Sequence, residues 1–444
     1  AAGNGGAIAN NGILTSSNNS FQTNIANNGG AISVDAGDTP SANSSNDLFD
    51  SNTAARVGGA IYESGSTLDV AGGVFQSNTA GGSDGGFAGD GGAIFTASDT
   101  EISLSTFIGN SALAGVGAVG TGGSIFYSGA LTLVDSTIEN ALAGIGGGLY
   151  GTSNGVATIS GTTFDSNVAA GSGTAGGAIG GSGTLEITNS TLSGNTTSGN
   201  GAGIGLLAGS ARLNNVTLAF NASTGLGGPF YAEGGAVITF TNSLFSGNTG
   251  GGTNCNTVVS LGYNLFQNLF LDTQGEPCPP LASDIEADPQ IGLLASNGGP
   301  TQTHSLGANS PARDAADPGQ LAIELSSALN ASQLTFNGAA TQFEGVLIPV
   351  SGYFTRGSVY ASAPDEGPFD LSESFSTQFS FRITDPVAYS VEPSGDGFTF
   401  AVAANPTVLG EAGGRLGVAT SPLSLIHISE PTRLVHSSRM PSSA

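Results

Sequence analysis

Apolar and polar residues alternate in short stretches throughout the first 256 residues of the chain. In residues 131–134 and 184–188 every second side chain is apolar, which is the period of a β-strand with one buried face. Two glycines and an Ala-Ile or similar dipeptide precede most of these stretches, and a Phe-x-x-Asn tetrapeptide follows many of them. The pattern predicts short strands that are joined by tight turns and built on a repeating unit.

The repeating unit is 24 to 33 residues long and occurs about nine times. One unit is too thin to bury its own apolar side chains, so successive units must stack on one another. We therefore predict an all-β chain in which residues 1–256 form a right-handed, single-stranded parallel β-helix. The expected first residues of the nine coils are Gly5, Gly29, Gly58, Gly91, Gly122, Gly146, Gly176, Gly201 and Gly234.

Rows of equivalent side chains should run along this rod, because equivalent positions of successive coils lie above one another. Two rows are apolar and should point inward. The first contains Ile8, Ile32, Ile61, Ile94, Ile125, Leu149, Ile179 and Val237, and the second contains Phe21, Phe49, Phe75, Phe107, Phe164 and Phe245. Asparagine tolerates left-handed turns, and its amide can bond to the next coil. A structural asparagine ladder is therefore expected at Asn24, Asn52, Asn78, Asn110, Asn140, Asn167, Asn195, Asn221 and Asn248.

The charge of the chain is strongly negative, since 33 acidic residues against 8 basic ones give a net charge of −25. Nucleic acids and anionic membrane surfaces both require cationic patches, so we expect neither nucleic-acid binding nor membrane insertion. The two cysteines, Cys255 and Cys278, favour a disulfide in a chain of this composition. Two thiols alone are too few for a metal site. We expect a secreted or cell-surface protein.

The repeat also carries recognisable tetrapeptides. Gly-Gly-Ala-Ile begins at Gly29, Gly58, Gly91 and Gly176, and Phe-x-x-Asn begins at Phe49, Phe75 and Phe245. This combination resembles the repeats of polymorphic outer-membrane proteins, which are β-helical surface adhesins of bacteria. Residues 138–140 depart from the pattern by one residue, and residues 201–204 replace the second glycine by alanine. The resemblance implies the fold and a bacterial surface location but no particular activity.

Residues 257–318 contain Gly-Tyr-Asn-Leu, Asp-Pro-Gln-Ile-Gly, Asn-Gly-Gly-Pro-Thr, Thr-His-Ser-Leu and Ser-Pro-Ala-Arg-Asp in succession. This series resembles the end module of choice-of-anchor bacterial surface proteins. We expect the module to be the C-terminal cap of the β-helix, because an open last coil would expose an unpaired strand edge. His304 lies in this module, and we expect it to be a structural hydrogen-bonding residue.

Residues 319–422 alternate in strand-like stretches at 334–340, 357–360, 375–381, 395–400 and 413–417. These stretches resemble the first half of a legume-type (L-type) lectin domain, which implies a partial antiparallel β-sandwich of the jelly-roll type. The resemblance further implies carbohydrate binding by Asp396, with help from the backbone N–H of Gly414. It implies calcium in the intact lectin-like domain, whose ligands we expect to follow beyond this chain.

Residues 423–433 and 438–444 resemble translated adapter sequences from DNA library preparation, with residues 434–437 as the index between them. We therefore expect residues 423–444 to be no part of the native protein.

The repeat offers few residues that could form a catalytic site. Polysaccharide lyases need a basic residue beside clustered acids, and hydrolases need two facing carboxylates, yet Arg56 and Arg212 are the only basic residues of the rod. Asp50 and Asp165 occupy the same coil position but should be four coils apart. We predict no catalytic residue, no resident metal and no cofactor.

Three functions remain open. The favoured one is an extracellular or cell-surface adhesin in which the β-helix is a stalk or display surface and the lectin-like domain recognises carbohydrate on a host or neighbouring cell. The alternative is a polysaccharide lyase or hydrolase with an appended carbohydrate-binding module. The third is a purely structural spacer.

Overall fold

The computed structural model describes residues 3–35, 41–81, 88–115, 118–313 and 315, together with six strands between residues 334 and 428. The chain divides into two compact units, residues 1–317 and residues 318–444. All regular elements in the described ranges are β-strands. The part of the chain that the structure describes contains no helix long and apolar enough to cross a membrane.

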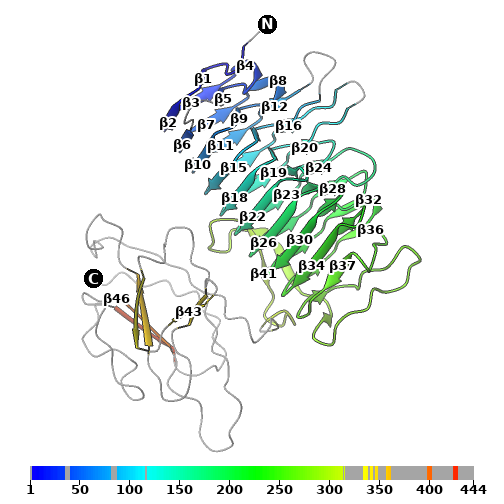
Figure 1. Ribbon diagram of the computed structural model, residues 1–444. Coiled ribbons are helices and arrows are strands. Elements are labelled where there is room, and N and C mark those ends of the chain that lie inside the picture. The colour runs from blue at the N-terminus through cyan, green and yellow to red at the C-terminus, as the bar shows by residue number, and fades with distance from the viewer. Residues whose placement is uncertain are drawn as a thin grey trace, which may run out of the picture. The chain divides into compact units, whose positions relative to one another are not determined.

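The first unit is a parallel β-helix of about nine coils (Figure 1), which confirms the fold predicted from the repeat. Each coil contributes one strand to each of four parallel sheets, which we name A to D in the order in which the chain visits them. Sheet A comprises β1 (Ile8–Asn10), β5 (Ile32–Asp35), β9 (Ile61–Ser64), β13 (Ile94–Thr96), β17 (Ile125–Tyr127), β21 (Leu149–Gly151), β25 (Ile179–Gly181), β29 (Ile204–Leu206) and β33 (Phe230–Ala232). Sheet B comprises β2 (Ile13–Ser17), β6 (Ser41–Ser45), β10 (Thr67–Ala71), β14 (Thr100–Ser103), β18 (Ala130–Val134), β22 (Val156–Ser160), β26 (Thr184–Thr188), β30 (Ser210–Asn214), β34 (Val237–Thr241) and β37 (Val258–Ser260).

Sheets C and D complete each coil. Sheet C comprises β3 (Ser20–Gln22), β7 (Leu48–Asp50), β11 (Val74–Gln76), β15 (Thr106–Ile108), β19 (Thr137–Glu139), β23 (Thr163–Asp165), β27 (Thr191–Ser193), β31 (Thr217–Ala219), β35 (Leu244–Ser246), β38 (Leu265–Phe266) and β39 (Ile285–Glu286). Sheet D comprises β4 (Ile25–Asn28), β8 (Thr53–Val57), β12 (Thr79–Ala80), β16 (Ser111–Ala112), β20 (Leu142–Ala143), β24 (Val168–Ala169), β28 (Thr196–Thr197), β32 (Ala222–Leu226) and β36 (Thr249–Gly251).

The glycine pair that opens each coil forms the corner between sheets D and A. Gly91, for example, has φ +65, and a Cβ there would collide with the carbonyl group of Ile94. Glycine is the residue that adopts this backbone without strain. The ninth coil begins at Gly227, which has the same geometry, and not at Gly234 as the sequence suggested. Gly234 lies instead in the turn between sheets A and B.

The first apolar row follows sheet A, and its members pair in register from Ile8 to Ile204 and then to Phe230. The prediction of Val237 as the last member is wrong, because Val237 lies at the start of β34 in sheet B and is 37% exposed. Phe230 replaces it because the ninth coil starts seven residues earlier than expected. The other seven predicted members occupy the row.

The second apolar row follows sheet C and is confirmed from Phe21 to Phe245. Aligned residues Ile138, Leu192 and Leu218 complete it, and Phe266 extends it beyond the ninth coil. Rings of consecutive members stack, with centroids 4.6 Å apart for Phe49 and Phe75. Aromatic contacts of this kind contribute about 0.5–1.5 kcal/mol beyond the apolar area they bury.

The asparagine ladder forms at the corner between sheets C and D. Within each run of the ladder, the Oδ1 of one asparagine accepts hydrogen bonds from the backbone N–H and the side-chain amide of the asparagine one coil earlier. The Oδ1 of Asn78, for example, lies 3.0 Å from both nitrogens of Asn52. Each amide also donates to the carbonyl group of a residue in the apolar row of the preceding coil, as Asn195 does to Phe164 at 3.0 Å. The bonds connect two runs, Asn24, Asn52, Asn78 and Asn110, and Asn167, Asn195, Asn221 and Asn248.

Asn140 was expected in the ladder and does not belong to it. Because Ile138 aligns with the phenylalanine row, the ladder position of this coil is three residues later and is occupied by Ala141. Ala141 is buried and can only donate its backbone N–H to Asn167, while Asn140 is exposed with φ 55. The ladder is therefore interrupted once, between Asn110 and Asn167.

A second polar row, which the sequence analysis missed, follows the corner between sheets B and C. Hydroxyl, amide or carboxylate oxygens of one coil accept the backbone N–H of the preceding coil, as Ser136 does from Ser105 at 3.1 Å and Asn264 does from Ser243 at 2.9 Å. These acceptors stand two residues before the apolar row. The row comprises Asp47, Ser105, Ser136, Thr162, Ser190, Ser243, Asn264 and Asp284.

Residues 257–286 extend the rod only on two sides. Sheet B gains β37, and sheet C gains β38 and β39, whereas sheets A and D end at β33 and β36. This part of the predicted cap therefore adds strands to sheets B and C at the C-terminal end and none to sheets A and D. The remainder forms an antiparallel hairpin of β40 (Ile291–Ala295) and β41 (Thr303–Leu306).

The second unit contains three antiparallel strand pairs in its described ranges. These are β42 (Leu334–Gly338) with β45 (Gly357–Ala361), β43 (Thr341–Phe343) with β44 (Val346–Ile348), and β46 (Phe398–Val402) with β47 (Ser424–Ile428). The pairs agree with an all-β unit, and the lectin-like sandwich stays a prediction. β47 belongs to the segment 423–444, whose adapter-like origin also stays a prediction.

Candidate binding surfaces

Two carboxylates stand side by side on the outer face of sheet C. Glu139 of β19 and Asp165 of β23 are direct partners in the register of neighbouring coils, which places their backbones about 4.8 Å apart. Burial raises the pKa of Glu139, and the charge of Asp165 raises it further. The pKa of Asp165 is raised by burial and lowered to a smaller degree by its bond to Ser166 and by His304.

The pairing of Glu139 with Asp165 does not follow from the predicted alignment, because that alignment displaces residues 138–140 by one position. The predicted placement of Asp165 in the same column as Asp50 is confirmed by the register, which passes through Gln76, Ile108 and Glu139. Correct alignment of Ile138 with Phe107 is the signal that would have found Glu139 next to Asp165. Paired carboxylates with raised pKa values are a recurrent feature of hydrolytic sites, although ion networks also produce them.

The hairpin β40–β41 is fastened along sheet C beside this pair, so the expectation that the whole end module caps the rod is wrong for these residues. Thr163 donates a hydrogen bond to the carbonyl group of Gln302 at 2.6 Å. Thr301 donates to the carbonyl group of Gly161 at 2.8 Å. These two bonds attach the hairpin to coil six, three coils before the end of the ninth.

His304 is the third attachment of the hairpin, and its structural role is the one predicted. Its Nδ1 lies 2.8 Å from the carbonyl oxygen of Gly292, which can only accept a hydrogen bond, so Nδ1 carries the proton. In the neutral ring Nε2 then accepts from the hydroxyl group of Ser193 at 3.0 Å. Ser193 is 4% exposed, and the ring of Phe220 meets the imidazole edge-on. The pair therefore anchors the hairpin and presents no accessible nucleophile.

Sheet A carries a different surface, a row of half-buried aromatic rings on its outer face. Tyr62, Phe95, Phe126 and Tyr150 occupy the same strand position in coils three to six. Their rings stack with centroids 5.4, 4.8 and 5.6 Å apart. Stacking fixes the rotamers of the row, so it presents ring edges and two tyrosine hydroxyl groups along an ordered apolar strip.

Asp90 lies beside this aromatic row, at the corner that precedes coil four. Its carboxylate accepts a hydrogen bond from the hydroxyl group of Thr121 at 2.5 Å. Burial raises the pKa of Asp90, and the bonds from Thr121 oppose this shift. Burial and the charge of Asp90 together raise the pKa of the Tyr150 hydroxyl group, so the hydroxyl stays protonated and able to donate.

Glu63, another acid of sheet A, is fully buried and points into the rod. Oε1 accepts from the backbone and hydroxyl groups of Ser66, and Oε2 accepts from the hydroxyl group of Thr96 and from two backbone N–H groups of the next coil. Five donors satisfy a buried carboxylate. Glu63 therefore joins the corners of coils three and four and is unavailable to a substrate.

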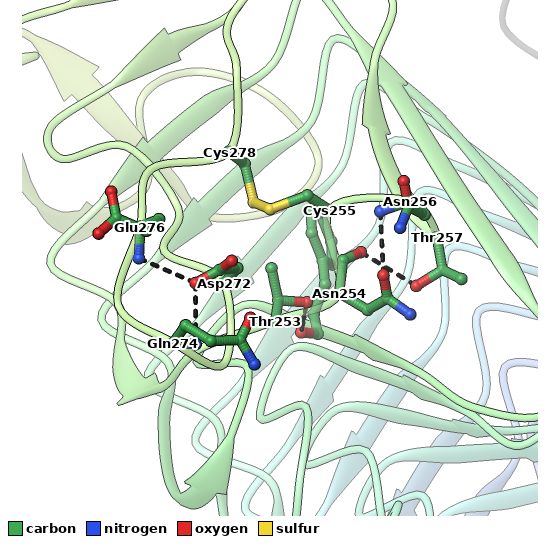
Figure 2. The surroundings of a disulfide bond; sticks show 10 residues. Thr253, Asn254, Cys255, Asn256, Thr257, Asp272, Gln274, Glu276 and Cys278 are labelled. Atoms are coloured by element: carbon green, nitrogen blue, oxygen red, sulfur yellow. Dashed lines mark hydrogen bonds between the residues drawn. A yellow bond between two sulfur atoms is a disulfide. The ribbon is translucent and has the colours of Figure 1, made fainter.

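The predicted disulfide between Cys255 and Cys278 is present, with Cα atoms 5.3 Å apart. Figure 2 shows that it joins two loops, one containing Asn254 and Thr257 and the other organised around the carboxylate of Asp272. Asp272 accepts the backbone N–H groups of Gln274 and Glu276, both at 2.8 Å. The disulfide thus ties the segment that closes the rod to the end of the ninth coil.

The remaining predicted site residues, Asp396 and Gly414, lie outside the described residues. Among the residues that the structure does describe, no cluster of three or more histidine, cysteine, aspartate or glutamate side chains is arranged to hold a metal ion. Comparisons with protein-family models, with curated proteins and with solved structures found no match for this chain.

Proposed function

We propose that the chain is part of an extracellular or cell-surface binding protein of bacterial type. The β-helix serves as a rigid stalk and display surface, and the partner is carbohydrate on a host or neighbouring cell. In the intact protein the lectin-like segment, including Asp396 and Gly414, contributes recognition of the sugar.

The observation that carries this proposal is the ordered aromatic row on sheet A. Aromatic residues are enriched in binding surfaces, and exposed apolar strips on a stable scaffold commonly mark them. The rings of Phe95 and Phe126 are held by their neighbours before any partner arrives, which lowers the entropy lost on binding. The disulfide supports an oxidising, extracellular location.

The test is binding of the full chain to an array of glycans and polysaccharides. The double variant Phe95→Ser and Phe126→Ser should lose most of the signal, and Asp396→Ala should weaken any component that the lectin-like segment contributes. Thr158→Ala is the matched control, because Thr158 is exposed on sheet B in coil six, away from the row. Unchanged binding by the double variant would remove sheet A from the site.

A second candidate function, hydrolysis of polysaccharides, is favoured by one observation, the pair of Glu139 and Asp165. In a retaining hydrolase two carboxyl groups about 5 Å apart act as acid and nucleophile, and raised pKa values suit the acid. Release of reducing ends by the full chain, abolished in Glu139→Gln and in Asp165→Asn, would support it. Asp50→Asn is the control, since Asp50 shares the column but has no acidic neighbour in register. Absence of turnover on acidic and neutral polysaccharides would rule it out.

A further inference from the structure

The four sheets do not all end at the same coil, so the C-terminal end of the rod has a step. β33 and β36 are the last strands of sheets A and D, while sheets B and C continue. Residues 267–278 fold back over the step, and the backbone N–H of Thr253 donates to the carbonyl group of Leu271 at 2.7 Å. The edge of β33 keeps backbone groups that no further strand of sheet A pairs in the described part of the chain.

A cleft of about 220 Å³ lies in this step. One side is formed by the glycine-rich segments 227–230 and 250–253, and the other by residues 267–271. Every residue that lines the cleft is uncharged, although the chain as a whole carries a charge of −25. The cleft therefore offers no ionic attraction to phosphate groups, metal ions or acidic ligands.

Hydrogen-bonding groups line the cleft without carrying charge. Gln267 is oriented by its Oε1, which accepts from the hydroxyl group of Ser246 at 2.9 Å and from the backbone N–H of Gly247 at 2.7 Å. This orientation leaves both Nε2 hydrogens as donors. The exposed amide of Asn268 adds a donor and an acceptor at the rim.

The apolar wall of the cleft is rigid. Phe270 meets Phe230 and Phe245 edge-on, with centroids 6.0 and 5.1 Å apart, and leaves part of its ring exposed. The backbone N–H of Cys278 donates to the carbonyl group of Phe270 at 2.7 Å, so the disulfide with Cys255 holds this wall in place.

We propose that this cleft binds one neutral sugar unit of a glycan. A pyranose ring has an apolar C–H face and a rim of hydroxyl groups, which match the wall at Phe270 and the amides of Gln267 and Asn268. The volume is below the roughly 300–1,000 Å³ of pockets for larger ligands, which fits a single ring. This assignment rests on the proposed function and names the ligand and the residues for a second, terminal site.

The test is titration of the full chain with methyl glycosides of neutral hexoses and N-acetylhexosamines, followed by saturation-transfer NMR. At least one neutral glycoside should bind with a dissociation constant on the order of 1 mM, the range for a ligand of this size. A uronic acid should not bind. Asn268→Ala and Gln267→Ala should each weaken binding about fivefold, the effect of one lost hydrogen bond. Asn256→Ala is the control, because Asn256 is exposed on the disulfide loop and does not line the cleft.

Melting curves establish that each variant is folded. Asn268→Ala should disturb the fold less than Gln267→Ala, because the side chain of Asn268 is exposed at the rim. Equal affinity of Asn268→Ala, Gln267→Ala and the unmodified chain would overturn the cleft as a site while leaving glycan binding elsewhere intact. Failure of every neutral glycoside to bind, together with a positive glycan array, would also overturn it. A negative array would remove the proposed function itself.

Discussion

The middle coils of the rod and its C-terminal end bury aromatic rings in two different ways. In the middle, Phe49, Phe75 and Phe107 are stacked nearly parallel, each on the equivalent residue of the next coil. At the end, the ring of Phe270 meets Phe230 and Phe240 at interplanar angles of 84° and 72°, in an irregular cluster.

The difference shows that a repeat supplies packing contacts between neighbouring coils but does not close the end of the rod. A middle coil obtains apolar contacts, backbone pairing and the asparagine ladder from its two neighbours, so the same short sequence suffices in every coil. The last coil has one such neighbour. On its second side, β37 and β38 continue the repeat only in sheets B and C, and the rest is closed by residues 267–278, which lack the repeat and are held by the bond between Cys255 and Cys278.

The largest effect should follow from a charge placed in the middle of the stack. Ile94 is fully buried between Ile61 and Ile125, and Ile94→Asp would bury a carboxylate without a partner. We expect a loss of more than about 4 kcal/mol in the free energy of unfolding, with several coils disordered. Urea denaturation followed by circular dichroism measures this loss. A denaturation midpoint equal to that of the unmodified chain would contradict the inward assignment.

Removal of the disulfide should destabilise the C-terminal end of the rod and leave the stability of the middle coils unchanged. The bond spans 23 residues, and closing a loop of that size stabilises a protein by about 3 kcal/mol. In the variant Cys255→Ser with Cys278→Ser we expect amide hydrogen exchange to increase in residues 253–286. Protection in coils three to seven should be unchanged. Equal loss of protection along the whole rod would show that the end and the middle do not differ as described.

A smaller effect, in the stabilising direction, should follow from repair of the asparagine ladder. Ala141→Asn places an amide between Asn110 and Asn167, where it can accept from one and donate to the other. Each hydrogen bond contributes about 1 kcal/mol, so we expect a rise in melting temperature. Asn140→Gly is the control, since its φ of 55 suits glycine and its side chain lies outside the ladder. A melting temperature lowered by Ala141→Asn would mean that the coil leaves no room for the amide.

The smallest effect concerns the outer face of the middle coils. Because the folded protein raises the pKa of Glu139, it binds this proton more readily than the unfolded chain does. Ionisation of Glu139 therefore costs stability as the pH rises through the pKa of the folded state. Glu139→Gln should be more stable than the unmodified chain at pH 7, and this difference in stability should disappear as the pH falls through the raised pKa of Glu139 to the ordinary glutamate value of about 4.3. A difference that stays constant over this range would show that burial and Asp165 do not raise the pKa of Glu139.

The sequence predicted the interior of the rod far better than its exterior. Interior positions repeat because each side chain must fit an equivalent one above and below, so Ile32, Phe75 and Asn195 could be assigned from spacing alone. The disulfide also followed from composition. Errors arose where one coil broke the pattern, as at Asn140, and where a second glycine pair followed the true one, at Gly234.

Exterior features obey no such stacking rule. The hairpin β40–β41 reaches Ser193 and Gly161 across separations of 111 and 140 residues, and no local pattern encodes that contact. The outward direction of Tyr62 and Phe95 follows from the inward assignment of Ile61 and Ile94, but the inward rows alone do not indicate that aromatic residues stack on the outer face. The cleft at the end depends on where sheets A and D stop.

Cross-linking of registered positions tests the stacked architecture most directly. Thr158 of β22 and Glu186 of β26 are exposed partners in adjacent coils, and a coil spacing of about 4.8 Å is within the Cα separation that a disulfide spans. The double variant Thr158→Cys with Glu186→Cys should form a new disulfide under mild oxidation, detected by mass spectrometry of proteolytic fragments. Thr158→Cys with Arg212→Cys, two coils apart, should not. No bond in the first variant, or equal bonding in both, would contradict the parallel in-register stack.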